Sequence, residues 1–254
     1  MIKIKDVSFS YPDFKIEKLN LTIEKGEIVA VCGNNGSGKT TLLKLLSGHL
    51  KPKKGEILID EIPRNKSTAR IGVVFQNPDN QIIFNNVNDD ICFTLKNYRV
   101  PKQEFNQRVT AALETMRMSA YKNSETMNLS TGQKQRIVIA NMLAIDPQIL
   151  LFDEATAYLD SGTKQLIYEL FGELKKRGVT VIFTTNQLDE VAYADRVLVF
   201  EQGQLFADKT KQAAIQDLSI FSGMEIPLKL KLLNLLNSNL STDDELFQLI
   251  KDKL

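Results

Sequence analysis

The types and spacing of the residues in Gly33-Asn34-Asn35-Gly36-Ser37-Gly38-Lys39-Thr40-Thr41 predict a phosphate-binding loop. The run before it, Glu27 to Cys32, is apolar and β-branched, which predicts a buried strand. Helical spacing follows the loop and stops near Gly48. A strand, a glycine-rich turn and a helix in this order point backbone N–H groups at a polyphosphate. We therefore expect Lys39 to reach the β- and γ-phosphates and the Thr40 hydroxyl to ligate Mg²⁺.

Two acidic residues follow a second apolar strand. Gln148 to Phe152 begins after a break at Asp146-Pro147, and Asp153 and Glu154 come next. A carboxylate at the end of this strand would lie beside the phosphates, where Asp153 could hold Mg²⁺ through water. A solvated acidic turn is the alternative, and the strand before the pair and the phosphate loop upstream favour the metal-binding interpretation.

A capping box opens a helix shortly before this strand. Ser130 stands at the N-cap and Gln133 three residues later, and the predicted helix runs from Gln133 to about Ala144. Its positive end would point outward from its own subunit, and Gly132 would permit close backbone approach. A plain capped helix is the alternative; the basic run Lys134 to Arg136 and the strand that follows favour a binding role.

The order of the remaining elements predicts an α/β fold. The first stretch, Met1 to about Ile23, has the pattern of two strands, and the stretch from Asn77 to about Ala144 is helical and polar. Alternation of strands and helices implies a parallel, doubly wound core. Gln202-Gly203 indicates a hairpin turn. Further strands are predicted at Gly55 to Asp60, Arg70 to Phe75, Val179 to Thr184 and Arg196 to Phe200.

We expect a main domain over residues 1–218, with a helical subdomain at about 77–145, and a small helical appendage over 219–254. In the appendage, leucines at helical spacing should pack it onto itself or onto a partner. They are Leu228, Leu232, Leu235 and Leu236.

Composition excludes several classes of protein. The chain has 254 residues, of which 43% are hydrophobic and 25% charged, as in ordinary globular proteins. A net charge of +1 gives no electrostatic case for binding nucleic acid. We find no apolar run long enough to span a bilayer and no signal peptide. Cys32 and Cys92 stand in apolar contexts and are expected to be buried, reduced thiols.

The phosphate loop, the capping-box segment and the acidic strand end, in this order and at this spacing, resemble the ATP-binding cassette (ABC) family over essentially the whole chain. The resemblance implies a P-loop NTPase fold: a RecA-like core with a mostly parallel sheet, an N-terminal antiparallel β subdomain and an α-helical signature subdomain. It implies ATP and Mg²⁺ as ligands, sandwiched between two subunits. In this family Glu154 would be the general base, and Gln76 would contact Mg²⁺ and the attacking water.

The resemblance assigns further residues to the nucleotide. Tyr11 would stack on adenine, with a core or strand-edge tyrosine as the alternative. Ser130, Gly132 and Gln133 would bind the γ-phosphate held by the opposite subunit. Asp160 would lie in a loop that crosses to the other subunit's site, with a plain helix N-cap as the alternative.

Two residues depart from the family pattern. Thr131 stands where the family has a second glycine, and because a β-branched residue cannot adopt positive φ cheaply, we expect slightly weaker donation from this signature. Asn186 stands where the family has histidine. Asparagine can donate an amide hydrogen bond toward the γ-phosphate but carries no proton or charge, so this subunit's own site is expected to be slow or non-hydrolytic. The alternative is that Asn186 holds the phosphate well enough.

Two segments, Val74 to Gln81 and Val87 to Phe93, are similar to the ATPases of energy-coupling factor (ECF) transporters, which import vitamins and metal ions. Phe221 to Pro227 resembles that family's tail. The likeness implies a peripheral subunit on the cytoplasmic face of the membrane, docked to an integral coupling subunit through the Gln76 to Asp90 region. A separate membrane subunit would select the substrate. Asp89 and Asp90 would belong to the docking groove, with a solvated helix face as the alternative.

A heterodimer with a paralogous ATPase fits Asn186 better than a homodimer, because a second subunit with the histidine could supply the working site. Two other functions remain open. A soluble ABC ATPase in cofactor assembly or repair is disfavoured by the single phosphate loop and by the lack of a coiled-coil insertion. A nucleotide-sensing module that binds without hydrolysis is favoured by Asn186 and opposed by Glu154.

Overall fold

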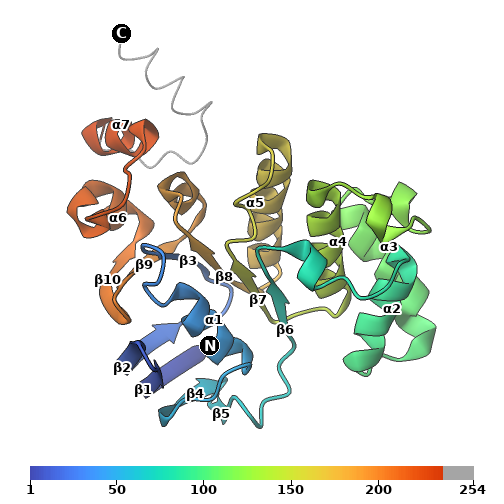
Figure 1. The fold of residues 1–254 in the computed structure, drawn as a ribbon, viewed down its shortest axis with the longest axis horizontal. Helices are drawn as coiled ribbons and strands as arrows, with labels where there is room; N and C mark the ends of the chain where they lie inside the picture. The colour runs from blue at the N-terminus through green and yellow to red at the C-terminus, as the bar shows by residue number, and fades with distance from the viewer. Residues whose placement is uncertain (237–254) are drawn as a thin grey trace. The chain divides into compact units, whose positions relative to one another are not determined.

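The structure, a computed structural model, describes residues 1–236 (Figure 1). It divides into two compact units. Among the described residues, the phosphate-loop unit comprises 1–65 and 183–236, and the signature unit comprises 66–182. No helix among residues 1–236 has the length and apolar character that a membrane span requires. The predicted appendage lies outside the described residues from position 237 to its end.

An antiparallel sheet with the strand order β2-β1-β4-β5 opens the phosphate-loop unit. It consists of β1 (Ile2–Tyr11), β2 (Phe14–Ile23), β4 (Lys54–Ile59) and β5 (Ile62–Pro63). The alternating residues Ile2 and Ile4 are buried, as period-two patterning requires when only one face of a sheet is covered. The predicted antiparallel N-terminal subdomain is therefore confirmed.

The second sheet has six strands, and three of them lie in order in the phosphate-loop unit as β10-β9-β3. Strand β3 (Ile28–Cys32) is buried throughout and pairs in parallel with β9 (Arg196–Glu201). Strand β10 (Gln204–Thr210) is antiparallel to β9. The turn between β9 and β10 is the predicted hairpin: Gln202 and Gly203 have φ of 47° and 82°, as a two-residue turn of type I′ requires.

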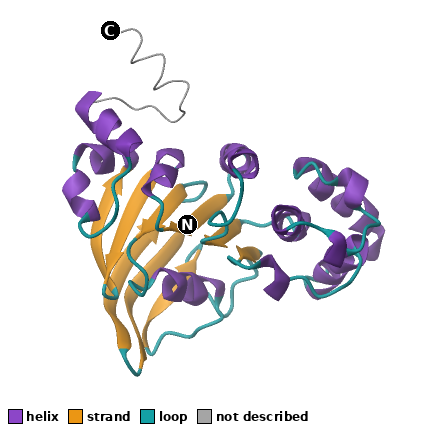
Figure 2. Ribbon diagram, turned by 45° about the horizontal axis from the view of Figure 1, so that its top comes forward, coloured by secondary structure: helices purple, strands orange, loops and turns teal. Residues whose placement is uncertain are grey.

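The signature unit holds the parallel neighbours β6 (Ile71–Val74) and β7 (Ile149–Asp153) of the same sheet. Strand β8 (Thr180–Thr185) runs across the boundary between the units. The predicted helical stretch consists of α2 (Val87–Asn97), α3 (Phe105–Thr115) and α4 (Thr131–Ala144), with short 3-10 turns between them. Helix α4 packs against both α2 and α3 (Figures 1 and 2). Helix α5 (Ser161–Lys176) follows β7 and buries Ile167, Leu170, Phe171 and Leu174, whereas Leu166 is half-buried.

The start of the predicted appendage packs on the phosphate-loop unit rather than standing apart. Helix α7 (Leu228–Leu236) contacts α6 (Lys211–Gln216) and the 3-10 helix η5 (Leu188–Tyr193). Of the predicted leucines, Leu228 is 71% exposed and Leu232 is half-buried, and the structure does not describe the side chains of Leu235 and Leu236. The buried face of α7 carries Leu230 and Leu233. Asn234 fixes this face, because its amide donates to the carbonyl oxygens of the last two residues of α6 at 2.7 and 2.9 Å.

Candidate functional site

The phosphate loop joins the end of β3 to α1 (Lys39–Ser47). Gly38 is the N-cap of α1 with φ of 111°, and a Cβ there would lie 2.8 Å from the ring of Phe14. At Gly33 a Cβ would lie 2.3 Å from the Phe200 carbonyl oxygen. Both positions exclude side chains, so the glycines permit this path of the backbone. The Gly203 N–H of the β9–β10 turn donates to the Ser37 carbonyl at 2.9 Å and holds the loop from outside.

Lys39 lies inside this loop and is 4% exposed. Its ammonium donates to the carbonyl oxygens of Gly33 at 2.7 Å and Asn34 at 3.2 Å. A buried ammonium on the first residue of a helix adds its positive charge to that of the helix N-terminus. This half of the site therefore suits a polyphosphate anion, as the sequence predicts.

Tyr11 ends β1 and borders a hollow of about 680 Å³. The same hollow is lined by Gly36 of the phosphate loop and by Gln202 of the hairpin turn. The Tyr11 ring packs edge-on against Phe9 at 4.9 Å between centroids, yet the residue remains 42% exposed. An exposed aromatic face beside a phosphate loop is available for stacking on a planar base.

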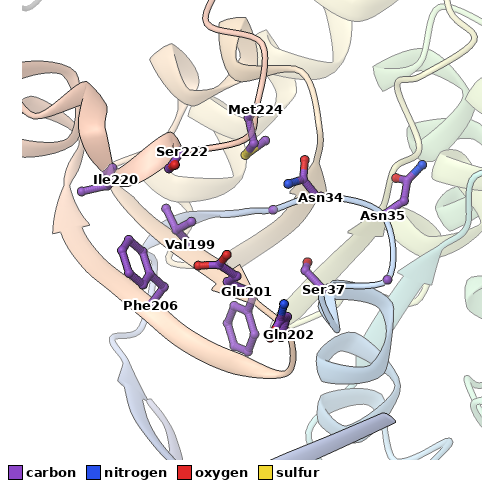
Figure 3. A pocket seen from close by; sticks show the side chains of 13 residues that line it. Asn34, Asn35, Ser37, Val199, Glu201, Gln202, Phe206, Ile220, Ser222 and Met224 are labelled. Carbon is purple, nitrogen blue, oxygen red and sulfur yellow. The ribbon is translucent and has the colours of Figure 1, made fainter. Parts of the chain in front are cut away.

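A second hollow, of about 250 Å³, lies on another side of the phosphate loop (Figure 3). Asn34 and Ser37 line it from the loop, Glu201 lines it from the end of β9, and Ser222 and Met224 line it from the segment after the 3-10 helix η6 (Leu218–Phe221). The predicted tail segment Phe221 to Pro227 therefore borders the phosphate loop within its own unit.

Asn186 is the first residue after β8, and it is exposed. Thr185 holds its turn, because the Thr185 hydroxyl accepts the Gln187 N–H at 2.9 Å. The 3-10 helix η5 follows this turn and packs against β3, the strand that leads into the phosphate loop. Asn186 thus stands at the end of a buried strand, as the sequence predicts, and the structure leaves it exposed.

The two acidic residues after β7 differ in exposure and in backbone conformation. Asp153, the last residue of the strand, is 8% exposed, whereas Glu154 is half-buried. Glu154 has φ of 48°, a left-handed conformation that costs free energy for a residue with a Cβ and that concentrates at functional sites. No residue pattern in the sequence predicts this backbone conformation.

The capping box at the start of α4 is present as predicted. The Gln133 N–H donates to the Ser130 hydroxyl at 3.3 Å, and the Ser130 N–H donates to the Gln133 side-chain oxygen at 2.9 Å. Thr131 is the first residue of α4 and does not have positive φ. The expectation that Thr131 weakens the signature was therefore wrong in its reason, because this position needs no glycine conformation.

Gly132 and Asp160 lie beside each other within the signature unit. A Cβ on Gly132 would meet the Asp160 carboxylate at 3.7 Å, an ordinary contact distance. Asp160 is the N-cap of α5 and accepts the Thr163 N–H and hydroxyl, each at 2.9 Å. These two hydrogen bonds lower the pKa of the Asp160 carboxyl. Asp160 therefore acts as a helix N-cap, the alternative stated above, and it is still exposed.

Gln76 lies two residues beyond the end of β6 and is half-buried. After it the chain forms the 3-10 turn η1 (Pro78–Asn80) and reaches α2 through Ile83 and Phe84, which are 66% and 40% exposed. We call residues 76–90 the docking segment. Two adjacent apolar side chains of this segment are therefore exposed, which the sequence pattern did not predict.

Asp90 does not face the surface, contrary to the prediction that it forms part of a partner groove. It is 2% exposed, and its carboxylate accepts the N–H groups of Ile83 at 2.8 Å and Phe84 at 3.0 Å. Asn141 of α4 donates to its other oxygen at 2.6 Å. Asp90 therefore fixes the path of the docking segment from inside, and only Asp89 is exposed.

The cysteines are free thiols, as predicted, although only Cys32 is fully buried. Burial raises the pKa of the Cys32 thiol to about 12, so it stays protonated and inert within β3. Cys92 on α2 is half-buried.

Comparison with known proteins places these elements in one family. Residues 16–157 match the ABC transporter family. The chain is 41% identical over 216 residues to the energy-coupling factor transporter ATP-binding protein EcfA1 of Mycoplasma mobile, covering 82% of this chain and 79% of that one. It is 38% identical to EcfA1 of Staphylococcus epidermidis over 93% of this chain and 92% of the relative.

Two solved structures share the fold. CbiO1 from Clostridium perfringens, described as part of the ABC transporter complex cbiONQ, superposes with a TM-score of 0.77 at 34% identity, over 86% of this chain and 92% of that one. The ATP-binding cassette MJ0796, solved as a dimer bound to ADP and Pi, superposes with a TM-score of 0.74 at 29% identity, over 83% and 99%. The predicted P-loop NTPase fold is therefore confirmed.

Proposed function

Because the chain belongs to the ABC transporter family, among the ATP-binding proteins of energy-coupling factor transporters, we propose that it powers an importer by hydrolysing ATP between two subunits. The observation that carries this proposal is that one chain holds both a phosphate loop with a buried lysine and a capping-box helix of the signature type. A subunit with both parts can bind a nucleotide on one and complete a partner's site with the other.

We propose ATP and Mg²⁺ as the ligands, on the chemistry of the residue types present. The Thr40 hydroxyl, the Asp153 carboxylate and the Gln76 amide oxygen are oxygen donors, the type that Mg²⁺ prefers. Bound Mg²⁺ would neutralise charge that develops on the phosphates. The base would stack on Tyr11, and the phosphates would lie along the loop. The loop residues are Gly33, Asn34, Asn35, Gly36, Ser37, Gly38, Lys39, Thr40 and Thr41.

Glu154 is proposed as the general base that orients and deprotonates the attacking water. Asn186 would donate to the γ-phosphate in place of a histidine. Because an amide carries no charge, we propose that hydrolysis on this chain's own phosphate loop is slower than on a loop served by histidine.

The second subunit would meet the signature residues Ser130, Gly132 and Gln133 and the exposed Asp160. Within its own chain a Cβ at Gly132 would meet Asp160 and Thr163 at ordinary contact distances, so packing within one chain does not require glycine there. We propose that the missing side chain lets a phosphate from outside the chain approach the backbone closely. The MJ0796 cassette was solved as a dimer, which supports the same arrangement. A paralogous partner with the histidine fits Asn186 better than a second copy of this chain.

We propose that the docking segment binds an integral membrane coupling subunit and holds the chain at the cytoplasmic face of the membrane. Its exposed side chains Ile83 and Phe84 form a small apolar surface that a partner helix could cover. A separate membrane subunit would select the substrate, a vitamin or a metal ion, as in the ECF family.

Co-purification tests this proposal. The full-length chain is tagged, expressed in its native organism and purified from detergent-solubilised membranes. An integral membrane protein and a second ATPase should co-purify with it. Changing Ile83 and Phe84 to serine should remove most of the membrane protein from the co-purified material, because these two apolar side chains would no longer be buried against it. The matched control is Phe206→Ser, since Phe206 is 57% exposed but lies on β10.

Recovery of the chain from the soluble fraction alone, with no membrane protein, would favour the soluble ABC ATPase instead. Co-purification that is equally strong in the Ile83 and Phe84 double variant would place the docking surface elsewhere on the chain.

A further inference from the structure

Two glutamine side chains hold the backbone of Phe75, the residue that precedes Gln76. The Phe75 N–H donates to the Gln81 side-chain oxygen at 2.7 Å, and the Gln81 amide donates in turn to the Val73 carbonyl at 2.9 Å. The Phe75 carbonyl accepts from the Gln135 amide at 3.1 Å. All of these residues lie within the signature unit.

These contacts lie where the sheet stops supporting the chain. Strand β6 ends at Val74, so Phe75 and Gln76 lie beyond its ladder of hydrogen bonds. The two amides replace that ladder for one residue, which restricts the direction in which the backbone leaves the strand. The direction of the Gln76 side chain follows from that restriction.

The two glutamines belong to different elements, one to the docking segment and one to α4. Gln81 belongs to the docking segment and is half-buried. Gln135 is 1% exposed on α4, two residues after the capping-box residue Gln133. An ion pair between the half-buried Lys134 of α4 and the exposed Asp79 of the docking segment, at 2.7 Å, joins the same two elements. The position of Phe75 therefore depends on the docking segment and on the signature helix together.

We propose that Gln81 and Gln135 are positioning residues that set Gln76 for its contact with Mg²⁺ and water. The proposal rests on the role of Gln76 in the proposed function. Neither glutamine touches the nucleotide in this scheme. Their effect passes through the backbone of Phe75, and the arrangement makes the placement of Gln76 sensitive to movement of either element.

Isosteric variants test the proposal. Gln81→Met and Gln135→Met keep the length of each side chain and remove its amide, and Gln107→Met, at an exposed position of α3, is the matched control. Binding of ATP to the full-length chain should be unchanged in all three. Hydrolysis should fall roughly 2- to 10-fold in the first two, the rate equivalent of one neutral hydrogen bond, and the Mg²⁺ concentration for half-maximal hydrolysis should rise.

A readout independent of hydrolysis is hydrogen–deuterium exchange at the Gln76 and Asn77 amides, which should quicken in Gln81→Met and Gln135→Met and not in Gln107→Met. Exchange in α5 should stay constant in every variant. If Gln135→Met unfolds, Gln81→Met decides, because Gln81 is only half-buried and lies outside the α-helices.

A double-mutant cycle with Gln76→Ala separates the role of Gln76 itself from the positioning role of Gln81 and Gln135. If the glutamines act through Gln76, their effect on hydrolysis disappears in the Gln76→Ala background. An equal effect in that background would overturn the positioning role and leave the proposed function intact. Unchanged hydrolysis in Gln76→Ala itself would remove the catalytic role of Gln76 and with it this proposal.

Discussion

At the scale of single residues, the backbone of Glu154 is the most informative local feature. Its φ of 48° is a left-handed conformation in a residue with a Cβ. Such strain costs about 1–3 kcal/mol and persists where the surroundings impose it. The half-buried position next to the buried Asp153 fits a carboxylate held in a fixed direction for chemistry.

Replacing Glu154 with Gln should therefore lower hydrolysis at the site on this chain's own phosphate loop, measured in a dimer whose partner site is silenced, and leave ATP binding intact. Loss of a general base lowers the rate roughly 10²- to 10⁴-fold, while the amide preserves the volume and the backbone conformation. The dimer closed on ATP should live longer, which size-exclusion chromatography with ATP would show. Glu173→Gln, an exposed change on α5, is the control. An unchanged rate at this chain's own site in Glu154→Gln, measured with the partner's site silent, would exclude the assigned role.

The contact between the docking segment and α4 buries one acidic residue of the pair Asp89 and Asp90 and leaves the other exposed. Asp90 is buried and accepts two backbone N–H groups and the Asn141 amide. Asp89 is exposed in the first turn of α2, where a negative charge interacts favourably with the helix N-terminus. Neighbours in the sequence thus have unrelated roles.

We expect Asp90→Ala to lower the free energy of unfolding by about 2–4 kcal/mol, because three donors lose a buried charged acceptor. Asp89→Ala should cost about 1 kcal/mol or less. Urea denaturation of the two variants measures the difference. Equal losses in the two variants would mean that the Asp90 contacts do not stabilise the native state. Because Asp90 is buried, a test of docking should change Asp89 alone, as in Asp89→Lys.

The elements that the sequence predicted well are those specified by nearby residues. The phosphate loop, the capping box at Ser130 and the hairpin at Gln202-Gly203 each depend on a few consecutive positions, where glycine conformation and side-chain caps act locally.

The errors concern contacts between distant segments. Asn141 bonds Asp90 across 51 positions and Gln135 bonds Phe75 across 60, and no local pattern marks such pairs. The start of α7 depends on such contacts as well: leucines at 228, 230, 232 and 233 offer several faces, and packing against α6 and η5 buries Leu230 and Leu233.

At the scale of the whole molecule, Asn186 raises the question of whether two subunits contribute equally. The residue follows the buried strand β8, and we propose that it takes the place of the histidine that contacts the γ-phosphate in the family. Imidazole offers reach and charge that an amide lacks. Loss of one charge-assisted hydrogen bond costs about 1.5–3 kcal/mol, or roughly 10- to 150-fold in rate when the bond forms only in the transition state.

Restoring the histidine by Asn186→His should therefore raise hydrolysis at the site built on this chain's phosphate loop. The rise should be clearest in a complex whose partner has its own general base neutralised, so that the partner's site is silent. Single-turnover hydrolysis in the two half-silenced complexes measures each site separately, and Glu154→Gln should be tolerated better than the equivalent change in the partner. If the two sites hydrolyse ATP at equal rates before any histidine is restored, Asn186 is a working substitute. The preference for a heterodimer would then lose its main support, because a symmetric pair of these chains could do the same work.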